Sequence, residues 1–198
     1  PRSSCLPTTD KGFEQDRKMY PFIRSANAFL FSKFRPKLQL TETHISRFIC
    51  WPWDIDMWGE LNNGRALSLF DIGRYGLLAR QGSVLEFYLK YKMSFTVAGL
   101  SVRYRRRMRP FRLFEMKTRV IFWDDKFLYL EQVINLPDGQ CAAHSLCRKA
   151  VIENRKIIQP AVAIERTFGL VPEQNTCPGW VKNWIDAEAT RPWPPDLI

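Results

Sequence analysis

The spacing of hydrophobic residues predicts two helices in the first half of the chain. Apolar residues recur at helical spacing from Tyr20 to Phe34, with basic residues elsewhere around that helix. From Ala66 to Leu78 they cover so much of the circumference that we expect a helix buried on more than one side. This second helix is expected to run from about Asn63 to Arg80, because Gln81-Gly82 is a plausible stop signal.

Strand patterns precede and follow the buried helix. Residues 42–51 alternate and are rich in strand formers, so they predict a first strand. Further strands are expected at residues 93–108, 111–123, 127–136 and 140–153. Turn signals at 124–126 and 137–139 separate the later ones, and we expect the four to form an antiparallel meander. This order of elements predicts an α+β domain whose sheet curls around the helix.

The chain divides into three predicted parts: an N-terminal extension at 1–41, the α+β domain at 42–158 and a C-terminal extension at 159–198. In the first part, the basic amphipathic helix either docks on its own domain or lies on an anionic membrane surface. The C-terminal extension holds six of the thirteen prolines and three of the seven tryptophans. Its segment from Pro178 to Ala189 predicts a short helix that packs across the domain as a lid or a partner surface.

Composition limits the partners and the cellular location that we expect for this domain. The chain has 30 Lys and Arg residues against 20 Asp and Glu, a net charge of +10, which favours partners that carry phosphates or carboxylates. Its five cysteines are scattered and it has two histidines, so neither a disulfide framework nor a metal site is expected, and the predicted location is cytoplasmic. The apolar runs are too short to cross a bilayer and the first residues lack a signal-peptide layout, so we expect no transmembrane segment and no export.

A cluster of acids, tryptophans and asparagines stands immediately ahead of the buried helix. The segments Asp54-Ile55-Asp56, Glu60-Leu61-Asn62-Asn63 and Gly64-Arg65 resemble the D-x-D, three residues, H-x-N-N-A-R pattern of a known family. That family is the hotdog-fold acyl-CoA thioesterases of the 4-hydroxybenzoyl-CoA thioesterase-like type. The later strands are similar as well, so the resemblance covers roughly residues 42–152.

The resemblance implies a hotdog fold, in which a long central helix is wrapped by a curved antiparallel β-sheet. It implies hydrolysis of an acyl-CoA thioester to a free acid and CoA, with coenzyme A present only as part of the substrate and no other cofactor. It also implies a homodimer or a dimer of dimers, with the sites at the subunit boundary.

Asp56 is the catalytic carboxylate that the resemblance implies, acting as a general base on water or as a nucleophile through an anhydride. The backbone N–H groups at the start of the helix, from Asn62 to Arg65, can polarise the thioester carbonyl through the helix dipole. The structural alternative is that Asp54 or Asp56 only caps a turn or a helix, a common use of Asp in loops.

Glu60 stands where the family often has His, and a carboxylate donates a hydrogen bond only when it is protonated. Close to Asp56, it either raises the pKa of one carboxyl group and serves acid–base chemistry, or it signals altered specificity or lost turnover. Asn62 and Asn63 can orient water or the thioester, or can cap the helix. The candidate catalytic residues are therefore Asp56, Glu60, Asn62 and Asn63.

Substrate binding is assigned to residues around these four. The large side chains of the motif, Trp53, Met57 and Trp58, can build a dry pocket for an acyl or aryl group. Alternatively, they can pack in the core or in a dimer interface. Eight basic residues lie between 102 and 119, where strand alternation would place Arg105 and Arg107 on one face. They suit the phosphates of coenzyme A, or they protect an edge strand from aggregation. The substrate-binding candidates are Trp53, Asp54, Met57, Trp58, Gly64, Arg65, Arg105 and Arg107.

Two other functions fit parts of this pattern. A non-catalytic hotdog module that binds acyl-CoA or another protein would explain Glu60 in place of His. Nucleic-acid binding would use the same arginines with the aromatic residues between them. No recognised nucleic-acid motif accompanies the basic run, so no nucleic-acid partner is expected.

Overall fold

The computed structural model describes residues 24, 26, 30–32, 34–82, 84–173 and 176–195. Its elements are β1 (His44–Ile49), the 3₁₀ turn η1 (Pro52–Asp54), α3 (Asn63–Gln81), α4 (Val84–Leu89), β2 (Met93–Tyr104), β3 (Leu113–Trp123), β4 (Leu128–Asn135), β5 (Cys141–Glu153), β6 (Lys156–Ile158), α5 (Pro160–Phe168) and α6 (Gly179–Ala189). Of the helix predicted at 20–34, residues 24, 26 and 30–32 are helical and Phe34 lies in a turn, whereas the other residues of that range lie outside the described residues.

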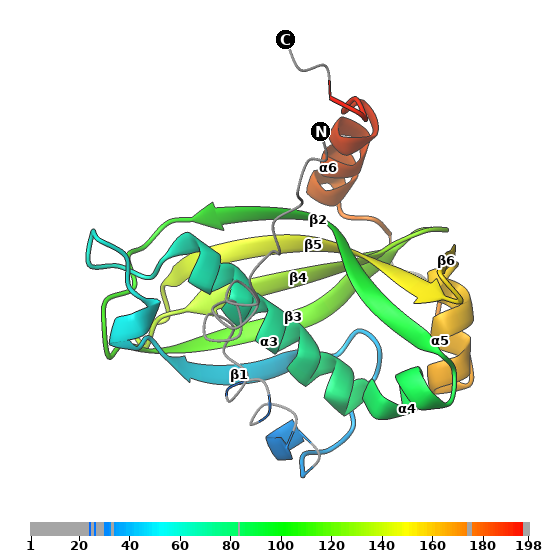
Figure 1. Cartoon of the computed structure of the whole chain (residues 1–198), viewed down its shortest axis with the longest axis horizontal. Coiled ribbons are helices and arrows are strands. Elements are labelled where there is room, and N and C mark those ends of the chain that lie inside the picture. Colours follow the sequence, from blue (N-terminus) through cyan, green and yellow to red (C-terminus); the bar gives the residue numbers. More distant parts are fainter. Residues whose placement is uncertain are drawn as a thin grey trace, which may run out of the picture.

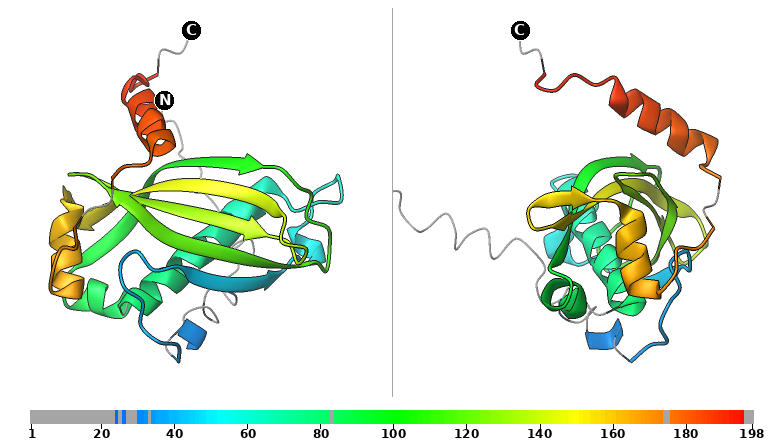
Figure 2. Two further views of the ribbon diagram at one scale, coloured as in Figure 1. Left: turned by 180° about the vertical axis from the view of Figure 1, so that it is seen from behind. Right: turned by 90° about the vertical axis from the view of Figure 1, so that its right-hand side faces the viewer.

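A curled antiparallel sheet wraps around the long helix α3, as the two views in Figure 2 show. The strand order is β1-β3-β4-β5-β2, and the short β6 pairs with β5. In Figure 1, α3 runs along the hollow of this sheet, from the end that holds η1 to the end that holds α4 and α5. The prediction of an α+β fold with a long central helix inside a curved antiparallel sheet is therefore confirmed.

The predicted meander of four strands is wrong in one respect. β3, β4 and β5 are neighbours joined by short turns, but β2 pairs with β5 and not with β3. The connection between β2 and β3, residues 105–112, is longer than a hairpin turn and crosses the end of the curled sheet (Figure 1). The strand alternation predicted for Arg105 and Arg107 does not apply either, because β2 ends at Tyr104.

α3 lies close to the sheet because two of its positions carry no side chain. A Cβ atom at Gly73 would lie 2.5 Å from Met116 Sδ, and one at Gly76 would overlap the ring of His44. The helix is buried on several sides, as predicted. Its buried residues are Ala66, Leu69, Phe70, Ile72, Gly73, Arg74, Gly76 and Leu77.

One charged residue, Arg74, lies inside this interface between α3 and the sheet. Only 4% of its surface is exposed. Nη1 donates to Gln132 Oε1 at 2.6 Å, and Nη2 donates to Asp71 Oδ1 at 3.0 Å. The Gln132 amide in turn donates to the carbonyl of Phe70 and to the hydroxyl of Thr118. A buried polar network therefore joins α3 to the sheet alongside the apolar packing.

Two helices follow the sheet in the segment predicted as a C-terminal extension. α5 places Ala163 and Ile164 in the same hydrophobic core as Leu77 of α3. α6, the short helix predicted there, packs Val181 against Tyr129 outside the curl of the sheet (Figure 2). Among the helices that the structure describes, none is long and apolar enough to cross a membrane.

Candidate active site

The loop between β1 and α3 is organised around a buried carboxylate, Asp54, which is 2% exposed. Its Oδ2 accepts from the Trp51 amide at 3.0 Å and forms an ion pair with Arg24 Nη2 at 2.7 Å. Its backbone carbonyl accepts from the Asn62 amide at 2.9 Å. A buried carboxylate needs such partners, because leaving its charge uncompensated costs several kcal/mol. Asp54 therefore holds the 3₁₀ turn against the start of α3, and it is not among the residues that line the pocket beside that helix.

Asp56 shapes the tight loop that follows. Its Oδ1 accepts from the Trp58 amide at 2.8 Å. Its own amide donates to the carbonyl of Glu60 at 2.9 Å, and its carbonyl accepts from Gly59 at 3.1 Å. Gly59 has φ +73°, a conformation that glycine adopts without strain. One carboxylate oxygen therefore forms the turn, whereas Oδ2 makes no hydrogen bond within the described part of the chain.

The first turn of α3 is capped by Asn62. Its Oδ1 accepts from the amides of Gly64 and Arg65 at 2.9 and 3.2 Å. Two of the N–H groups that were expected to polarise a carbonyl are therefore occupied by the protein itself. The amide of Asn63 is outside this cap, and Asn63 is exposed at the helix start.

A pocket of about 240 Å³ opens beside the start of α3. Its walls come from the loop before α3, from the first residue of the helix and from the connection after β2. The lining residues are Glu60, Leu61, Asn63, Tyr104, Arg105, Arg106, Arg107 and Met108. The Leu61 amide donates to the Met108 carbonyl at 2.9 Å and ties the two loops together. The fold thus places a helix N-terminus and three arginines around one hollow.

Glu60 forms an ion pair in the wall of this pocket. Its Oε2 lies 3.2 Å from Arg107 Nε, and the two side chains are 30% and 75% exposed, in that order. Because exposed ion pairs contribute at most about 1 kcal/mol to stability, this one matters mainly for where it holds the two side chains. The carboxylate that replaces the expected His is therefore engaged with an arginine.

The Cys50 thiol and the Tyr104 phenol both stay protonated at neutral pH. Burial raises the pKa of the Cys50 thiol to about 11, and the Asp54 carboxylate adds to this shift. Burial also raises the pKa of the Tyr104 phenol in the pocket wall. Asp56 and Glu60 are the partly exposed carboxylates of this loop. Within the described ranges, no three His, Cys, Asp or Glu side chains are grouped so that they could hold a metal ion.

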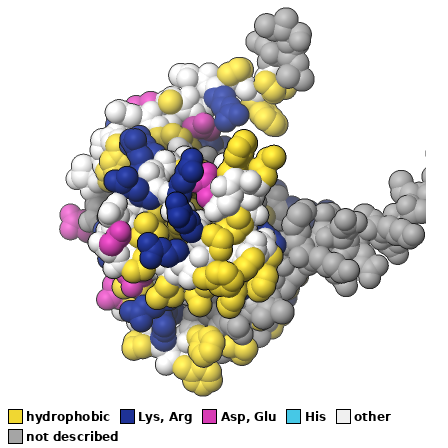
Figure 3. Space-filling view, turned by 90° about the vertical axis from the view of Figure 1, so that its left-hand side faces the viewer, with side chains coloured by type: hydrophobic (Ala, Val, Ile, Leu, Met, Phe, Trp, Pro, Cys, Tyr) yellow, Lys and Arg dark blue, Asp and Glu magenta, His cyan; other side chains and the backbone are white. Residues whose placement is uncertain are grey.

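The large side chains of the motif lie on the surface and not in the pocket lining. Trp53, Met57 and Trp58 are 64%, 87% and 73% exposed. Trp51 stacks on Trp53 with ring centroids 5.2 Å apart. Figure 3 faces this end of the molecule and shows Lys and Arg side chains gathered beside an area of exposed hydrophobic side chains. An exposed apolar area of this kind is typical of a surface that contacts a substrate or another subunit.

The structure brings four of the predicted site residues into one pocket: Glu60, Asn63, Arg105 and Arg107. Asp56 belongs to the same loop, and the Glu60 amide lies 3.5 Å from its Oδ1. Asn62, Gly64 and Arg65 form the capped first turn. Sequence reasoning missed Leu61, Tyr104, Arg106 and Met108 as lining residues. The strand end at Tyr104 is the missing signal for the residues after β2, because residues 105–108 lie in a loop where the alternation used for Arg105 and Arg107 does not hold.

Comparisons with known proteins identify the family of the chain. Residues 50–197 match the model of the thioesterase-like superfamily. Protein THEM6 from Xenopus laevis is 34% identical over 142 residues, which cover 70% of this chain and 68% of that protein.

Solved thioesterase structures share the fold. The YbaW probable thioesterase from Escherichia coli is similar with a TM-score of 0.58 and 21% identity, covering 63% of this chain and 95% of that one. A DHNA-CoA thioesterase from Staphylococcus aureus is similar with a TM-score of 0.56 and 17% identity, covering 74% of this chain and 91% of that one. Because the family match spans most of the chain and includes the loop and helix of the site, the chain belongs to the thioesterase-like superfamily of hotdog-fold proteins.

Proposed function

We propose that the protein hydrolyses acyl-CoA thioesters to a free acid and CoA in the pocket beside the start of α3. The observation that carries this proposal is the meeting of a helix N-terminus with three arginines in one pocket, next to the Asp56 loop, in a chain of this superfamily. Guanidinium groups suit the phosphates of coenzyme A. The helix start suits the carbonyl oxygen that gains negative charge in the reaction.

Asp56 is the proposed catalytic carboxylate. The Trp58 amide holds Oδ1 and orients the group, and Oδ2 is the oxygen proposed to act in the reaction. As a general base it takes a proton from the attacking water; as a nucleophile it forms an anhydride that water then cleaves. In both routes the Asn63 amide donates to the developing oxyanion, because the Asn62 side chain already accepts from the next two amides.

The proposal includes a homodimer in which the sites lie at the subunit boundary. Trp53, Met57 and Trp58 are exposed in the single chain and lie in the loop of the proposed site. A second subunit that covers them would exclude water from the acyl end of the substrate and give these side chains apolar contacts.

The test is the release of free CoA from a panel of acyl-CoAs by the wild type and by Asp56→Asn. The Asn side-chain oxygen can still accept from the Trp58 amide, so the loop is kept while the base is lost. We expect kcat to fall about 10²–10⁴-fold, the usual contribution of a positioned acid or base. An unchanged kcat would remove Asp56 from the mechanism.

Asp138→Asn is the matched control. Asp138 Oδ1 accepts from the Gln140 amide at 3.0 Å in an exposed turn, so it has the same local role as Asp56, but it lies between β4 and β5 and not in the loop before α3. This variant is expected to release CoA at the wild-type rate. A comparable loss in both variants would mean that the assay reports turn stability and not catalysis.

A second candidate function is acyl-CoA binding without turnover. Two observations favour it: the Asn62 cap on two helix amides, and the Glu60–Arg107 ion pair where the family pattern has His. It predicts that a non-hydrolysable acyl-CoA analogue binds while the wild type releases no CoA above the buffer rate. In that case Glu60→His is the informative variant, because a gain of CoA release would show that the native Glu60 had disabled the site.

A further inference from the structure

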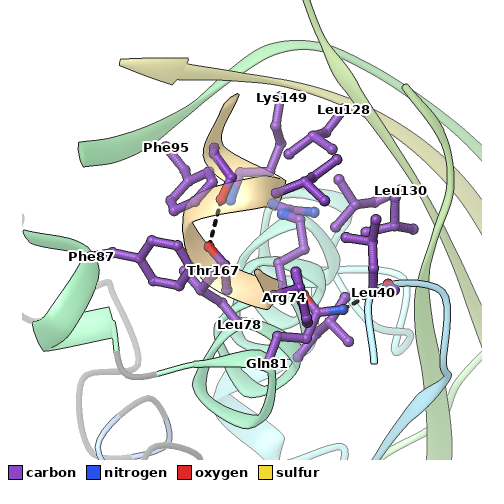
Figure 4. Close-up of a pocket in the computed structure, with 15 residues that line it drawn as sticks. Leu40, Arg74, Leu78, Gln81, Phe87, Phe95, Leu128, Leu130, Lys149 and Thr167 are labelled. Atoms are coloured by element: carbon purple, nitrogen blue, oxygen red, sulfur yellow. Dashed lines mark hydrogen bonds between the residues drawn. The ribbon is translucent and has the colours of Figure 1, made fainter. Parts of the chain in front are cut away.

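A second cavity lies between the C-terminal half of α3, the sheet and α5 (Figure 4). It encloses about 50 Å³, and its walls are mainly apolar, including Leu78, Phe87, Phe95 and Leu128. Along α3, the 14 residue steps from Asn63 to Leu77 correspond to about 21 Å. The cavity is therefore separate from the candidate active site.

Two buried side chains that carry a positive charge line this apolar cavity. Arg74 comes from α3 and Lys149 from β5, and they are 4% and 6% exposed. Figure 4 shows both side chains among the apolar ones that line the cavity. Lysine and arginine are almost never buried to this degree without a partner of opposite charge.

The positive charge of the pair is only half compensated. Arg74 Nη2 donates to Asp71 at 3.0 Å, whereas Arg74 Nε is buried without a hydrogen-bond partner. The Lys149 amine makes no hydrogen bond or ion pair with the residues that the structure describes, and its nitrogen lies 5.6 Å from the centre of the Phe95 ring. One carboxylate thus faces two cations, and an excess of one positive charge stays inside the cavity.

The other polar side chains in the lining already have partners. Gln81 Nε2 donates to the Leu40 carbonyl at 2.7 Å, and Thr167 Oγ1 donates to the Ala163 carbonyl at 2.6 Å, the two bonds drawn in Figure 4. Among the described residues, the Lys149 amine and Arg74 Nε are therefore the donors of the lining that lack a partner, and Nε itself is covered by protein atoms. Both are charged, so the ligand that they suit is an anion.

Burial and the charge of Arg74 lower the pKa of Lys149 to about 8. At neutral pH the amine is nevertheless still mostly protonated, so the excess charge persists. An unpaired ammonium group in a low-dielectric site is unfavourable, and an anion that enters the cavity would compensate it.

We propose that this cavity binds a small monocarboxylate with a short apolar chain, whose carboxylate contacts Lys149 and Arg74 while its chain packs on the leucine and phenylalanine walls. A single negative charge matches the excess of one positive charge. The volume is about one third of the roughly 150 Å³ cavity known to admit benzene, so it holds the carboxylate and the first carbons of such a ligand, and the end of the chain extends toward the open side of the cavity. This site does not rest on the proposed hydrolase, because its residues lie outside the pocket beside α3.

Thermal unfolding of the full chain in sodium butyrate tests the proposal, with sodium chloride at equal ionic strength and 1-butanol as comparisons. Butyrate combines the charge with the chain, whereas each comparison supplies only one of them. We expect a saturable rise in Tm with butyrate alone. An equal rise with chloride would show an unspecific anion effect, and an equal rise with butanol would show simple apolar filling; either result, or no rise at all, overturns the proposal.

Lys149→Met locates the effect, because methionine keeps the length of the side chain and removes its charge. We expect butyrate to bind this variant at least tenfold more weakly, and we expect the ligand-free variant to have a higher Tm than the wild type. Lys156→Met on the exposed strand β6 removes the same charge outside the cavity and should keep wild-type butyrate affinity. Retained affinity in Lys149→Met would overturn the proposal.

A titration of the wild type followed by amide NMR gives a measurement that needs no variant. Butyrate should shift the amides around Lys149 and Ala163 before those around Asn63. Shifts confined to the start of α3 would place the ligand in the other pocket and contradict the proposal. An assay of CoA release is independent of this result, so failure of the hydrolase and failure of this site can be told apart.

Discussion

His44 shows how burial makes the charge state of one residue matter for stability. It is buried at the start of β1, where it contacts α3 at Gly76. Nε2 is 2.8 Å from Ser46 Oγ, and Nδ1 is buried with no hydrogen-bond partner in the described structure. Burial, followed by the charges of Arg80 and Arg35, lowers the pKa of His44 to about 4. The folded protein therefore keeps this imidazole neutral at neutral pH.

The resulting prediction concerns acid stability. Above pH 6.5 the imidazole is neutral in both states and contributes nothing to the pH dependence. Between pH 6.5 and about 4 the unfolded chain takes up the proton first, so the free energy of unfolding falls as the pH falls. His44→Phe should remove this loss, which amounts to about 3 kcal/mol at about 1.4 kcal/mol per pKa unit. Denaturant titrations at pH 7 and pH 4 measure it.

Ser46→Ala is the control for this acid effect. It removes the hydrogen bond to His44 but leaves the titrating ring in place, so the loss of stability below pH 6.5 should persist. An equally steep acid loss in His44→Phe would contradict the assignment to His44.

Asp54 and Asp56 have different structural roles, which the local sequence around them does not predict. The two acids are two positions apart, and loop propensities treat them alike. In the structure Asp54 is buried against Arg24, thirty positions earlier, while Asp56 keeps one carboxylate oxygen outside its turn. The long-range ion pair separates their roles, and no local pattern contains it.

At the scale of elements, the contact between α3 and the sheet depends on the absence of side chains. A Cβ atom at Gly73 would lie 2.5 Å from Met116 Sδ and 3.0 Å from both Gln132 Nε2 and Thr118 Oγ1. Gln132 cannot move freely, because it also accepts from Arg74. The buried network therefore fixes how closely the helix approaches the strands.

Gly73→Ala is consequently expected to destabilise the fold. Alanine favours the helix by about 1 kcal/mol relative to glycine, but crowding in a packed core costs about 1–3 kcal/mol. We expect a net loss of about 1–2 kcal/mol in chemical denaturation, since the neighbouring atoms are held by other bonds. Gly179→Ala at the start of α6 is the matched control, because a Cβ there meets nothing within 4 Å. If Gly73→Ala is as stable as this control, the close approach is not a constraint.

At the scale of the whole molecule, the end of the sheet at β2 leads to the proposed dimer. β2 is 12 residues long and, among the described strands, it pairs only with β5. A long unpaired strand edge invites pairing with another chain. Two copies related by a two-fold axis would place β2 antiparallel to itself and cover both edges.

We therefore predict that the protein sediments as a species of twice the chain mass of 23.3 kDa. Because main-chain hydrogen bonds and apolar contacts would hold the pair, high salt should not dissociate it. Sedimentation equilibrium over a range of loading concentrations measures the mass. A mass of 23.3 kDa at every concentration would contradict the dimer and the shared site that is proposed with it.

Local patterns in the sequence determined the elements that carry the fold. The all-round apolar stretch that became α3, its stop at Gly82 and the alternating strands are set by side-chain periodicity and turn residues, so they could be predicted. The candidate loop was also recognisable, because its acids and asparagines are close together in the chain.

Only the tertiary structure decided how these elements meet. Pairing of β2 with β5 depends on the curl of the sheet, and the burial of Arg74 and Lys149 depends on which face of each element turns inward. The arginines reach the Asn63 pocket because the connection after β2 crosses the end of the sheet. These are contacts between residues far apart in the chain, and periodicity carries no information about them, since it reports only neighbours within one element.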